Sequence, residues 1–584
     1  MTLETNDPME ELLAIWALKN GLKLNVKMPI KSENKRIDEL EPALEAIGRK
    51  SRWQWFLFFL VSAPGVLNAI HISVYVFFTH HSPHWCSVQQ LESANWTVSQ
   101  IRNFTIPRDT KDWNHSCTYY NWDYTVLAPL GYEAAVAAVS SQPNPGILEC
   151  SKRSFMEDES ESSIESEWDL VCERTYLKSV VQSIFALGKF TGAIIFGVVS
   201  DKYGRKQSFL YAAWLYMISV PASIFISSFY LFLVTRFLIG VAGTGVYETA
   251  YTILSEITVG KWRTRFCTMF NISYPVGMLI LPLIAFYSPT WRTLQLYLTP
   301  LVFVLLLDCR FLPESPKWLM NENRKEEAWA IIKWADHSFQ RPSGKEENNS
   351  MVESPSKKVE DSKWYQNFYR SIKKLTDLFT NFELCKRILI CYSAWTVCAL
   401  VYYSLTFSGD VFNANKYIYI ALNGLIEAVA YLAPSILLAL FGRKLTSATL
   451  LLISGTAQLS TLLFRQDQTN LIVTVALIGR FADSAVFCIL ILVTSELFPT
   501  ALRNTAVGTS LMMAQVGSAL APFVVDILGM QGWYVPSVVC GALSILTTSL
   551  FLLLPETKNK PLFNTVDDID PKDKVSFSQC CRFT

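Results

Sequence analysis

A single acidic residue, Glu427, stands inside an apolar run, NGLIEAVAYLAPSILLALFGRK (423–444). A charge in the hydrocarbon core of a bilayer costs at least about 2.5 kcal/mol even on forgiving scales, so it is either paired or functional. Two roles are open: Glu427 neutralises a buried base of the protein, or it is the counter-charge for a cationic substrate. We favour the second role, because one carboxylate without a second charge beside it provides a weak, reversible site.

Further polar side chains stand at similar depth in other apolar runs. Gln515, like Glu427, lies 11 residues into its run, which places both about 16 Å deep, near the bilayer midplane. Lys189, in FALGKFTGA, can pair with Glu248 or with Glu427, line the vestibule, or bind an anionic group of the substrate. A lone polar residue in a membrane helix more often makes an interhelical hydrogen bond. The predicted substrate site nevertheless also includes Asn68, His71 and Tyr274.

Charged motifs recur in the two halves of the chain, in the same order and at offsets of 238 to 244 residues. Such a repeat indicates two six-helix bundles in parallel arrangement, and folds of this kind bind their substrate at the midplane between the halves. The longest matched pair keeps its Glu and Arg seven residues apart in both copies. The matches are YGRK (203–206) with FGRK (441–444), RF (236–237) with RF (480–481), SEITVGKWR (255–263) with SELFPTALR (495–503), and PESPK (313–317) with PETKN (555–559).

The repeated charges lie at the predicted cytoplasmic ends of the helices. Charged pairs there can hold the inner face closed and release it when the halves rock apart, which predicts a gate rather than a substrate pocket. Anchoring of helix ends at lipid headgroups explains some of the arginines, but not the repeated Glu–Arg spacing. The predicted gating residues are Asp201, Arg205, Glu256, Arg263, Glu314, Arg443, Glu496, Arg503 and Glu556.

The amino-acid composition indicates a membrane protein. Of its 584 residues, 51% are hydrophobic and 17% are charged, whereas an ordinary soluble domain has roughly 25% charged residues. A net charge of +1 provides no basic surplus for a nucleic-acid partner. Twelve apolar runs, each long enough to cross about 30 Å of hydrocarbon as a helix, predict an all-α protein in a lipid bilayer: 55–79, 177–200, 207–228, 229–253, 264–286, 290–311, 387–407, 416–440, 446–464, 470–494, 504–528 and 533–554.

Basic residues in the short loops set the predicted orientation. Nine lie in the even-numbered loops and two in the opposite loops, so the positive-inside rule places both termini in the cytoplasm. No apolar segment with a cleavage site precedes residue 55, so we expect no removable signal peptide. The predicted organisation is a cytoplasmic segment 1–54, a first bundle 55–311 containing a large extracellular loop 80–176, a cytoplasmic loop 312–386, a second bundle 387–554 and a cytoplasmic tail 555–584.

The loop 80–176 has features of an extracellular segment. Its sequons NWT, NFT and NHS predict glycosylation at Asn95, Asn103 and Asn114. Four of the 13 cysteines also lie in this loop. Outside the cell they can pair in any of three connectivities, among which the sequence does not choose. These disulfide candidates are Cys86, Cys117, Cys150 and Cys172.

Six motifs, spread over nearly the whole chain, form a specific combination: SEWDLVCE (166–173), SDKYGRK (200–206), RFLIGVAGTG (236–245), PESPKWL (313–319), SELFPTALRN (495–504) and LPETK (554–558). Together with the large cysteine-bearing loop, they resemble the organic cation, carnitine and organic anion transporter family of the major facilitator superfamily. The resemblance implies that superfamily's fold and alternating-access transport of small organic ions across a plasma membrane. One departure is Ala439, which stands where the first half has Asp201 and implies a weaker second gate.

Within that family, the chain is most similar to the organic cation and carnitine branch. GLIEAVA, with Glu427, resembles the eighth helix of those members. SAWTVCALVYY matches the family's aromatic pattern, which implies that Trp395 and Tyr402 line the site. Aromatic faces there attract amines by about 0.5–2 kcal/mol each. Gln515 departs from the family, whose cation members have an aspartate there and whose carnitine and anion members have an arginine. An amide supplies no charge to select a substrate.

The predicted function is transport of small organic cations or zwitterionic amines, such as a biogenic amine, a carnitine-like betaine or an amino-acid derivative, by a monomer in the plasma membrane. One alternative is an organic anion carrier, which Glu427 disfavours. Another is a receptor that binds a solute without moving it, which the charges on both cytoplasmic faces disfavour. An enzyme is not expected, because the sequence shows no nucleophile–base set, phosphate loop or metal cluster. No cofactor or metal is predicted, and the sequence does not identify a coupling ion.

Overall fold

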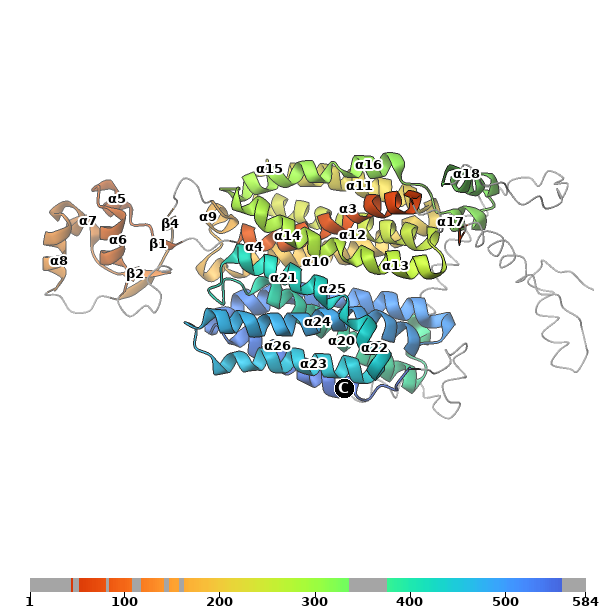
Figure 1. Cartoon of the computed structure of the whole chain (residues 1–584). Helices are drawn as coiled ribbons and strands as arrows, with labels where there is room; N and C mark the ends of the chain where they lie inside the picture. Colours follow the sequence, from red (N-terminus) through yellow and green to blue (C-terminus); the bar gives the residue numbers. More distant parts are fainter. Residues whose placement is uncertain are drawn as a thin grey trace, which may run out of the picture.

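Two groups of long helices lie side by side in this computed structural model, which describes residues 44–45, 52–79, 83–107, 117–140, 146–156, 162–335 and 375–558 (Figure 1). The first group comes from the first half of the chain and the second from the second half. The first comprises α3 (Arg52–Ser73), α4 (Tyr75–Phe78), α10 (Tyr176–Tyr203), α11 (Arg205–Ala222), α12 (Phe229–Ile257), α13 (Gly260–Asn271), α14 (Ser273–Phe286), α15 (Trp291–Val302) and α16 (Leu305–Phe311).

The second group also contains long and broken helices, but its breaks fall at other positions than those of the first group. Each predicted apolar run of the chain coincides with one helix or with a helix pair separated by a short break. The second group comprises α20 (Phe382–Phe407), α21 (Lys416–Ala430), α22 (Ala433–Phe441), α23 (Arg443–Ser460), η3 (Thr461–Leu463), α24 (Thr469–Leu497), α25 (Thr500–Gln531) and α26 (Val535–Phe551).

Nine helical segments of the described residues are long and apolar enough to cross a membrane. The helix α26 is apolar but has only 17 residues, so it falls short of that criterion. The mostly helical membrane architecture is therefore confirmed, while the number of twelve spans and the side on which the termini lie stay predictions.

A glycine makes the corresponding turn in each half. Gly204 separates α10 from α11 with φ of 101°, and Gly442 separates α22 from α23 with φ of 86°. Side chains other than glycine rarely adopt this left-handed backbone conformation. A Cβ atom on Gly204 would also lie 2.3 Å from Glu314 Oε2. The repeated motifs YGRK and FGRK therefore place an arginine directly after an obligatory glycine turn.

The two helix groups meet along two helix pairs. The helix α10 packs against α25, and α14 packs against α21. Within the groups, α12 packs against α10 and α11, whereas α23 packs against α24 and α26. Residues on α10, α14, α21 and α25 that face the partner group therefore lie at the boundary where the internal repeat predicts a substrate site.

The segment between α4 and α10 projects from one end of the helices, and α17 (Pro316–Asn321) and α18 (Lys325–Ala335) lie at the opposite end (Figure 1). The projecting segment has its own apolar core, which includes Trp85, Leu91, Trp96 and Phe104. Its elements are β1 (His84–Cys86), α5 (Gln89–Ser93), α6 (Val98–Thr105), β2 (Thr118–Tyr120), α7 (Tyr124–Leu127), η1 (Ala128–Leu130), α8 (Tyr132–Ser140), β3 (Ile147–Glu149), β4 (Arg153–Phe155), α9 (Ile164–Trp168) and η2 (Cys172–Arg174).

The all-α prediction needs a correction in this projecting segment. Strand β1 pairs antiparallel with β4, and β2 pairs antiparallel with β3. Only a segment that crosses hydrocarbon must satisfy every backbone group within a helix or a closed barrel, so short open strand pairs are compatible with a loop in water. Most of the predicted segments 1–54 and 555–584, and residues 336–374 of the predicted cytoplasmic loop, lie outside the described residues.

Candidate substrate site

Glu427 forms an ion pair with Arg480 in the interior of the second helix group. Arg480 Nη2 lies 2.8 Å from Glu427 Oε2, and both side chains are 0% exposed. Glu427 lies on α21 and Arg480 on α24, two helices that pack against each other. The internal partner that the sequence left open is therefore Arg480 in this structure.

Two tyrosines complete the surroundings of the Glu427 carboxylate. The Tyr402 hydroxyl lies 2.7 Å from Oε1 and 2.8 Å from Oε2. Tyr431, at the C-terminal end of α21, donates a hydrogen bond to Oε1. A buried anion needs several such donors to offset the loss of water. The three donating side chains therefore explain how a carboxylate is held in this apolar run.

Arg480 is in turn fixed by α20. Its Nη1 donates to the carbonyl oxygen of Tyr402 at 2.6 Å and to Thr406 Oγ1 at 2.7 Å. Its guanidinium carbon lies 3.5 Å from the centroid of the Tyr402 ring. The planar guanidinium can make these contacts together because it presents five donors in a fixed geometry and also stacks on aromatic faces. Arg480 thus links α20, α21 and α24.

Aromatic side chains gather around this ion pair. The ring centroids of Tyr402 and Tyr403 lie 5.0 Å apart, and Phe487 lies 6.1 Å from Tyr402 and 5.1 Å from Trp395. Tyr274 comes from α14 in the first helix group and is close enough to Glu427 and Tyr403 to interact with them electrostatically. The aromatic cluster therefore reaches from the second group to the boundary between the two groups.

Lys189 also lies at this boundary, but Arg480, and not Lys189, forms the ion pair with Glu427. Its Nζ lies 3.5 Å from the Tyr403 hydroxyl and 5.9 Å from the centroid of that ring. Glu248 on α12 is exposed and interacts electrostatically with Lys189. The boundary between the groups thus presents one base and one acid, Lys189 and Glu248, next to the tyrosines around Glu427.

The remaining predicted substrate residues lie in different parts of the two helix groups. Trp395 is fully buried, and its Nε1 donates to Thr494 Oγ1 at 3.1 Å. Gln515 is half-buried on α25. Asn68 and His71 are buried on α3 in the first group, where the His71 ring lies 5.3 Å from that of Tyr216. Trp395, Tyr402 and Tyr274 therefore belong to the cluster around Glu427, whereas His71 contacts the first group.

Two matching clusters of charge lie where α10 meets α11 and where α22 meets α23. In the first half, Arg205 Nη2 lies 3.0 Å from Glu256 Oε1, and Arg205 Nη1 lies 3.3 Å from Asp201 Oδ1. Glu314 accepts hydrogen bonds from the backbone N–H groups of Arg205, at 2.8 Å, and Lys206, at 3.2 Å. This cluster joins four parts of the first half.

The second half repeats the cluster without a counterpart of Asp201, as Ala439 implies. Arg443 Nε lies 3.3 Å from Glu496 Oε2, and Glu556 accepts hydrogen bonds from the backbone N–H groups of Arg443 and Lys444. Partial burial raises the pKa of Glu556, but its backbone donors outweigh that effect and hold the pKa below its usual range. The described ion pairs of both clusters stay within one half each.

Arg263 and Arg503, the arginines seven residues after the repeated glutamates, form no salt bridge with those glutamates among the described residues. Arg263 is exposed, and Arg503 Nη2 lies 3.4 Å from Thr500 Oγ1. Glu256 and Glu496 pair instead with the arginines of YGRK and FGRK. The repeated Glu–Arg spacing therefore marks matching helix ends, and among the described residues it does not mark a salt bridge.

We expect Arg205→Ala and Arg443→Ala to slow transport several-fold, because each removes the base that joins the ends of its helices. Arg263→Ala, the matched control, removes an exposed arginine that has no ion pair with Glu256 among the described residues, so its effect should be small. Initial uptake rates, divided by surface abundance, check this prediction. Equal rates in Arg205→Ala and Arg263→Ala would contradict it.

A buried charge network joins the two helix groups near the projecting segment. Lys178 Nζ lies 2.8 Å from Glu165 Oε1 and 3.7 Å from Asp526 Oδ1. Asp526 Oδ2 also accepts hydrogen bonds from the Tyr75 hydroxyl at 2.5 Å and from Ser179 Oγ at 2.8 Å. Sequence analysis missed this network. The available signal was that Lys178 and Asp526 stand at the ends of two apolar runs on the same predicted side.

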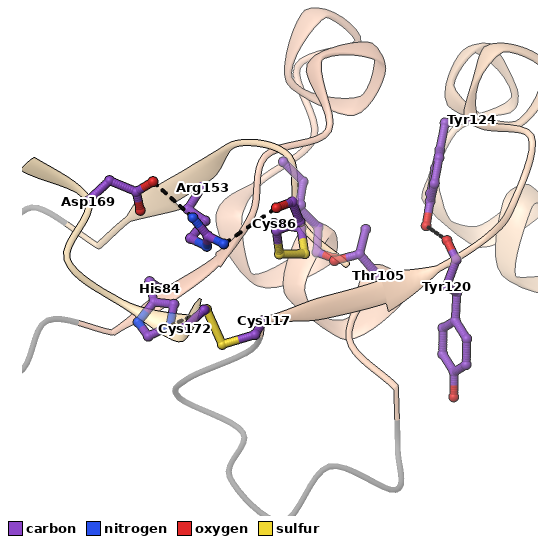
Figure 2. Close-up of a disulfide and its surroundings, with 11 residues drawn as sticks. His84, Cys86, Thr105, Cys117, Tyr120, Tyr124, Arg153, Asp169 and Cys172 are labelled. Atoms are coloured by element: carbon purple, nitrogen blue, oxygen red, sulfur yellow. Dashed lines mark hydrogen bonds and ion pairs between the residues drawn. A yellow bond between two sulfur atoms is a disulfide. The ribbon is translucent and has the colours of Figure 1, made fainter. Parts of the chain in front are cut away.

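Two disulfides close the projecting segment (Figure 2). They join Cys86 to Cys150 and Cys117 to Cys172, which is one of the three connectivities that the sequence allowed. Cys172 lies four residues before α10, so its disulfide ties the segment to the first helix group. His84 lies close to Cys117 and Cys172. Because both sulfurs are in a disulfide, they are not available as thiolate ligands for a metal.

The second prediction concerns glycosylation at the exposed sequons. Asn95 and Asn103 are both exposed, whereas Asn114 lies outside the described residues. We expect glycosidase treatment of the protein from native cells to increase its gel mobility, and Asn95→Gln with Asn103→Gln to remove part of that shift. A mobility that glycosidase leaves unchanged would contradict the extracellular placement of this segment.

Comparisons with known proteins agree with this architecture. A family model described as "Sugar (and other) transporter" matches residues 130–567. Solute carrier family 22 member 3 of Rattus norvegicus is 29% identical over 553 residues, which cover 93% of this chain and 97% of that protein. The chain belongs to solute carrier family 22 of the major facilitator superfamily. A member of this family is a multi-pass membrane transporter and not an enzyme.

Other solute carrier relatives and solved structures extend this result. The organic cation transporter protein of Drosophila melanogaster is 28% identical over 527 residues, or 89% of this chain and 93% of that protein. The beta-alanine transporter of the same organism is 29% identical over 562 residues, or 93% and 91%. The partially occluded inward-open structure of the E. coli xylose transporter XylE has a TM-score of 0.56 at 14% identity, covering 88% of this chain and all of that one. That structure supports the fold.

Proposed function

We propose that this solute carrier moves small organic cations or zwitterionic amines across the plasma membrane. Transport would proceed by alternating access of a site between the two helix groups, within one twelve-helix monomer whose termini are cytoplasmic. Repeat-built transporters bind their substrates between the halves near the midplane, and Glu427 lies on α21, one of the helices at that boundary.

The observation that carries the proposal is a carboxylate enclosed by tyrosines next to the boundary between the groups. Glu427 accepts from Tyr402 and Tyr431, and Tyr274 approaches from the other group. Aromatic rings and a carboxylate both attract a protonated or quaternary amine. Arg480 occupies the carboxylate in this structure, so binding of a cation requires that this ion pair loosen during the cycle.

Lys189 and Glu248 extend the proposal to zwitterions. They bring opposite charges to the boundary between the groups, next to Tyr403. An amino acid with separated amine and carboxylate matches such a pair of charges. The relatives include one described as an organic cation transporter and one described as a beta-alanine transporter, in keeping with both substrate classes.

The projecting segment supports placement in the plasma membrane with this segment outside. It contains two disulfides, which persist in oxidising compartments, and two exposed sequons. The basic residues of the short loops lie mainly at the opposite side by the positive-inside rule.

An uptake screen tests the proposed function. Cells that express the full chain receive labelled cations, zwitterionic amines and organic anions, and cells expressing Arg205→Ala serve as a matched control with the site intact. We expect accumulation of at least one cation or zwitterion. Accumulation of anions alone would overturn the substrate class, and surface-expressed protein that accumulates none of them would favour a receptor.

A further inference from the structure

The second helix group buries one base and two acids within one region. Arg480, Glu427 and Asp483 are each 0% exposed. Arg480 pairs with Glu427 at 2.8 Å, and Asp483 has no salt bridge of its own among the described residues. Among the described residues, neither carboxylate oxygen of Asp483, Oδ1 or Oδ2, has a nitrogen or oxygen hydrogen-bond partner. Asp483 is therefore an additional acid that the Glu427–Arg480 ion pair does not neutralise.

In the part of the chain that the structure describes, the groups that face Asp483 supply no other base. From α20, the Cys398 thiol lies beside its side chain and donates to its carbonyl oxygen at 3.7 Å. From α26, Cys540 is close enough to interact electrostatically, as is Glu427 from α21. On α23, the neutral Ser454 and Gln458 lie beside Gly479, one helical turn from Asp483. The helix α25 carries only two charged residues, Arg503 and Asp526, near its ends.

Arg480 is the one cation within reach of both acids among the described residues. It stands three residues before Asp483 on α24, and side chains at this spacing are neighbours on a helix. An unpaired carboxylate in an apolar interior is so costly that it takes up a proton. With Asp483 protonated, the three groups carry no net charge. Without that proton, they carry one negative charge.

We propose that Asp483 binds an exchangeable proton and that this solute carrier exchanges a proton for a cationic substrate. The proposal rests on the proposed function and names its coupling ion. When Asp483 releases its proton to water, Arg480 exchanges its hydrogen bond with Glu427 for one with Asp483. The freed Glu427 carboxylate then accepts an N–H of the substrate or attracts a quaternary amine. Proton and cation compete for the same single negative charge, and no electrons are transferred.

Transport across a membrane of known composition tests the coupling. The full chain is reconstituted in phospholipid vesicles that are acidic inside, and the probe is tetraethylammonium, whose permanent charge does not change with pH. For one-for-one exchange, a gradient of one pH unit sustains up to about tenfold accumulation. We expect this accumulation for the wild type and its collapse when the gradient is abolished. Asp483→Asn has no proton to release, so Arg480 should stay on Glu427 and the variant should accumulate no tetraethylammonium with or without the gradient. Accumulation by this variant that still follows the gradient would overturn the proton site. Asp483→Ser serves as a second variant if Asp483→Asn fails to fold.

Asp308→Asn is the matched control, because Asp308 on α16 is also buried with both oxygens lacking a partner among the described residues. This variant should keep the response to the gradient. Infrared spectra of the purified chain provide a readout that needs no substrate. We expect the C=O band of a protonated carboxylic acid in the wild type and in Asp308→Asn, with a component that disappears in Asp483→Asn.

The outcomes separate the two proposals. Accumulation of tetraethylammonium that ignores the gradient in the wild type overturns the proton coupling and leaves the proposed function standing. Failure to accumulate any cation or zwitterion overturns the proposed function, and the infrared band then still decides whether Asp483 holds a proton. A carboxylic acid band unchanged by Asp483→Asn overturns the proton site.

Discussion

Glu427→Gln is expected to lower the surface abundance of this solute carrier several-fold and to reduce uptake of every substrate with it. Glutamine keeps the shape and an acceptor for Tyr402, but it leaves the fully buried guanidinium of Arg480 without its ion-pair partner. Arginine cannot escape by losing its proton. Removal of one partner of a buried pair typically costs about 3–5 kcal/mol, which is a large part of a protein's stability.

Two double variants make this expectation specific. Glu427→Gln with Arg480→Leu removes both charges, and replacing a buried pair by neutral side chains can cost little, so surface abundance should recover while transport stays low. Glu427→Gln with Asp483→Asn removes both acids that lie near Arg480 among the described residues and should lower abundance further. Tyr431→Phe is the control, because it removes one hydrogen bond to Glu427 and leaves the ion pair in place.

Surface biotinylation and uptake on the same cells measure both quantities. Normal abundance of Glu427→Gln with loss of cation uptake would show that Arg480 does not depend on this carboxylate, and it would leave Glu427 with the substrate role alone. Normal abundance with undiminished cation uptake would exclude both roles.

Glu427 could be found from the sequence, whereas its partner could not. A carboxylate in an apolar run is conspicuous because the bilayer penalises it. Arg480 stands 53 residues further along the chain, and only the packing and rotation of α20, α21 and α24 decide that its guanidinium meets Glu427. Lys189 was an equally good partner by depth. In the fold it faces Tyr403 instead.

The internal repeat located the charged helix ends correctly but suggested the wrong pairs. Glu256 and Arg263 stand on different helices, because α12 ends at Ile257 and α13 begins at Gly260. Glu256 therefore meets Arg205, which is 51 residues away in sequence. The short strands of the projecting segment have three residues each, too few to produce a recognisable alternation of polar and apolar side chains.

Lys178→Met is expected to open the end of the molecule near the projecting segment. Lys178 is the base between two buried acids, Glu165 and Asp526, and the three side chains are 5%, 2% and 9% exposed. Methionine keeps the length of the side chain but leaves both carboxylates without that base. Asp526 keeps the hydroxyls of Tyr75 and Ser179, so the contact should weaken rather than disappear.

Thiol labelling reports this opening directly. Ser183 lies on α10, and its hydroxyl donates to the carbonyl oxygen of Ala519 on α25, so it marks the contact between the two helix groups. We expect Ser183→Cys to react slowly with a membrane-impermeant maleimide and several-fold faster when Lys178→Met is added. Arg174→Met is the control, because Arg174 is 49% exposed and lies 3.8 Å from its acidic partner Asp169, and such surface pairs contribute little.

Equal labelling in Lys178→Met and Arg174→Met would mean that the hydroxyl and helix contacts alone hold this end closed. Faster labelling in Lys178→Met alone would identify the Lys178 charge as the interaction that a transport cycle must break to admit substrate from this side.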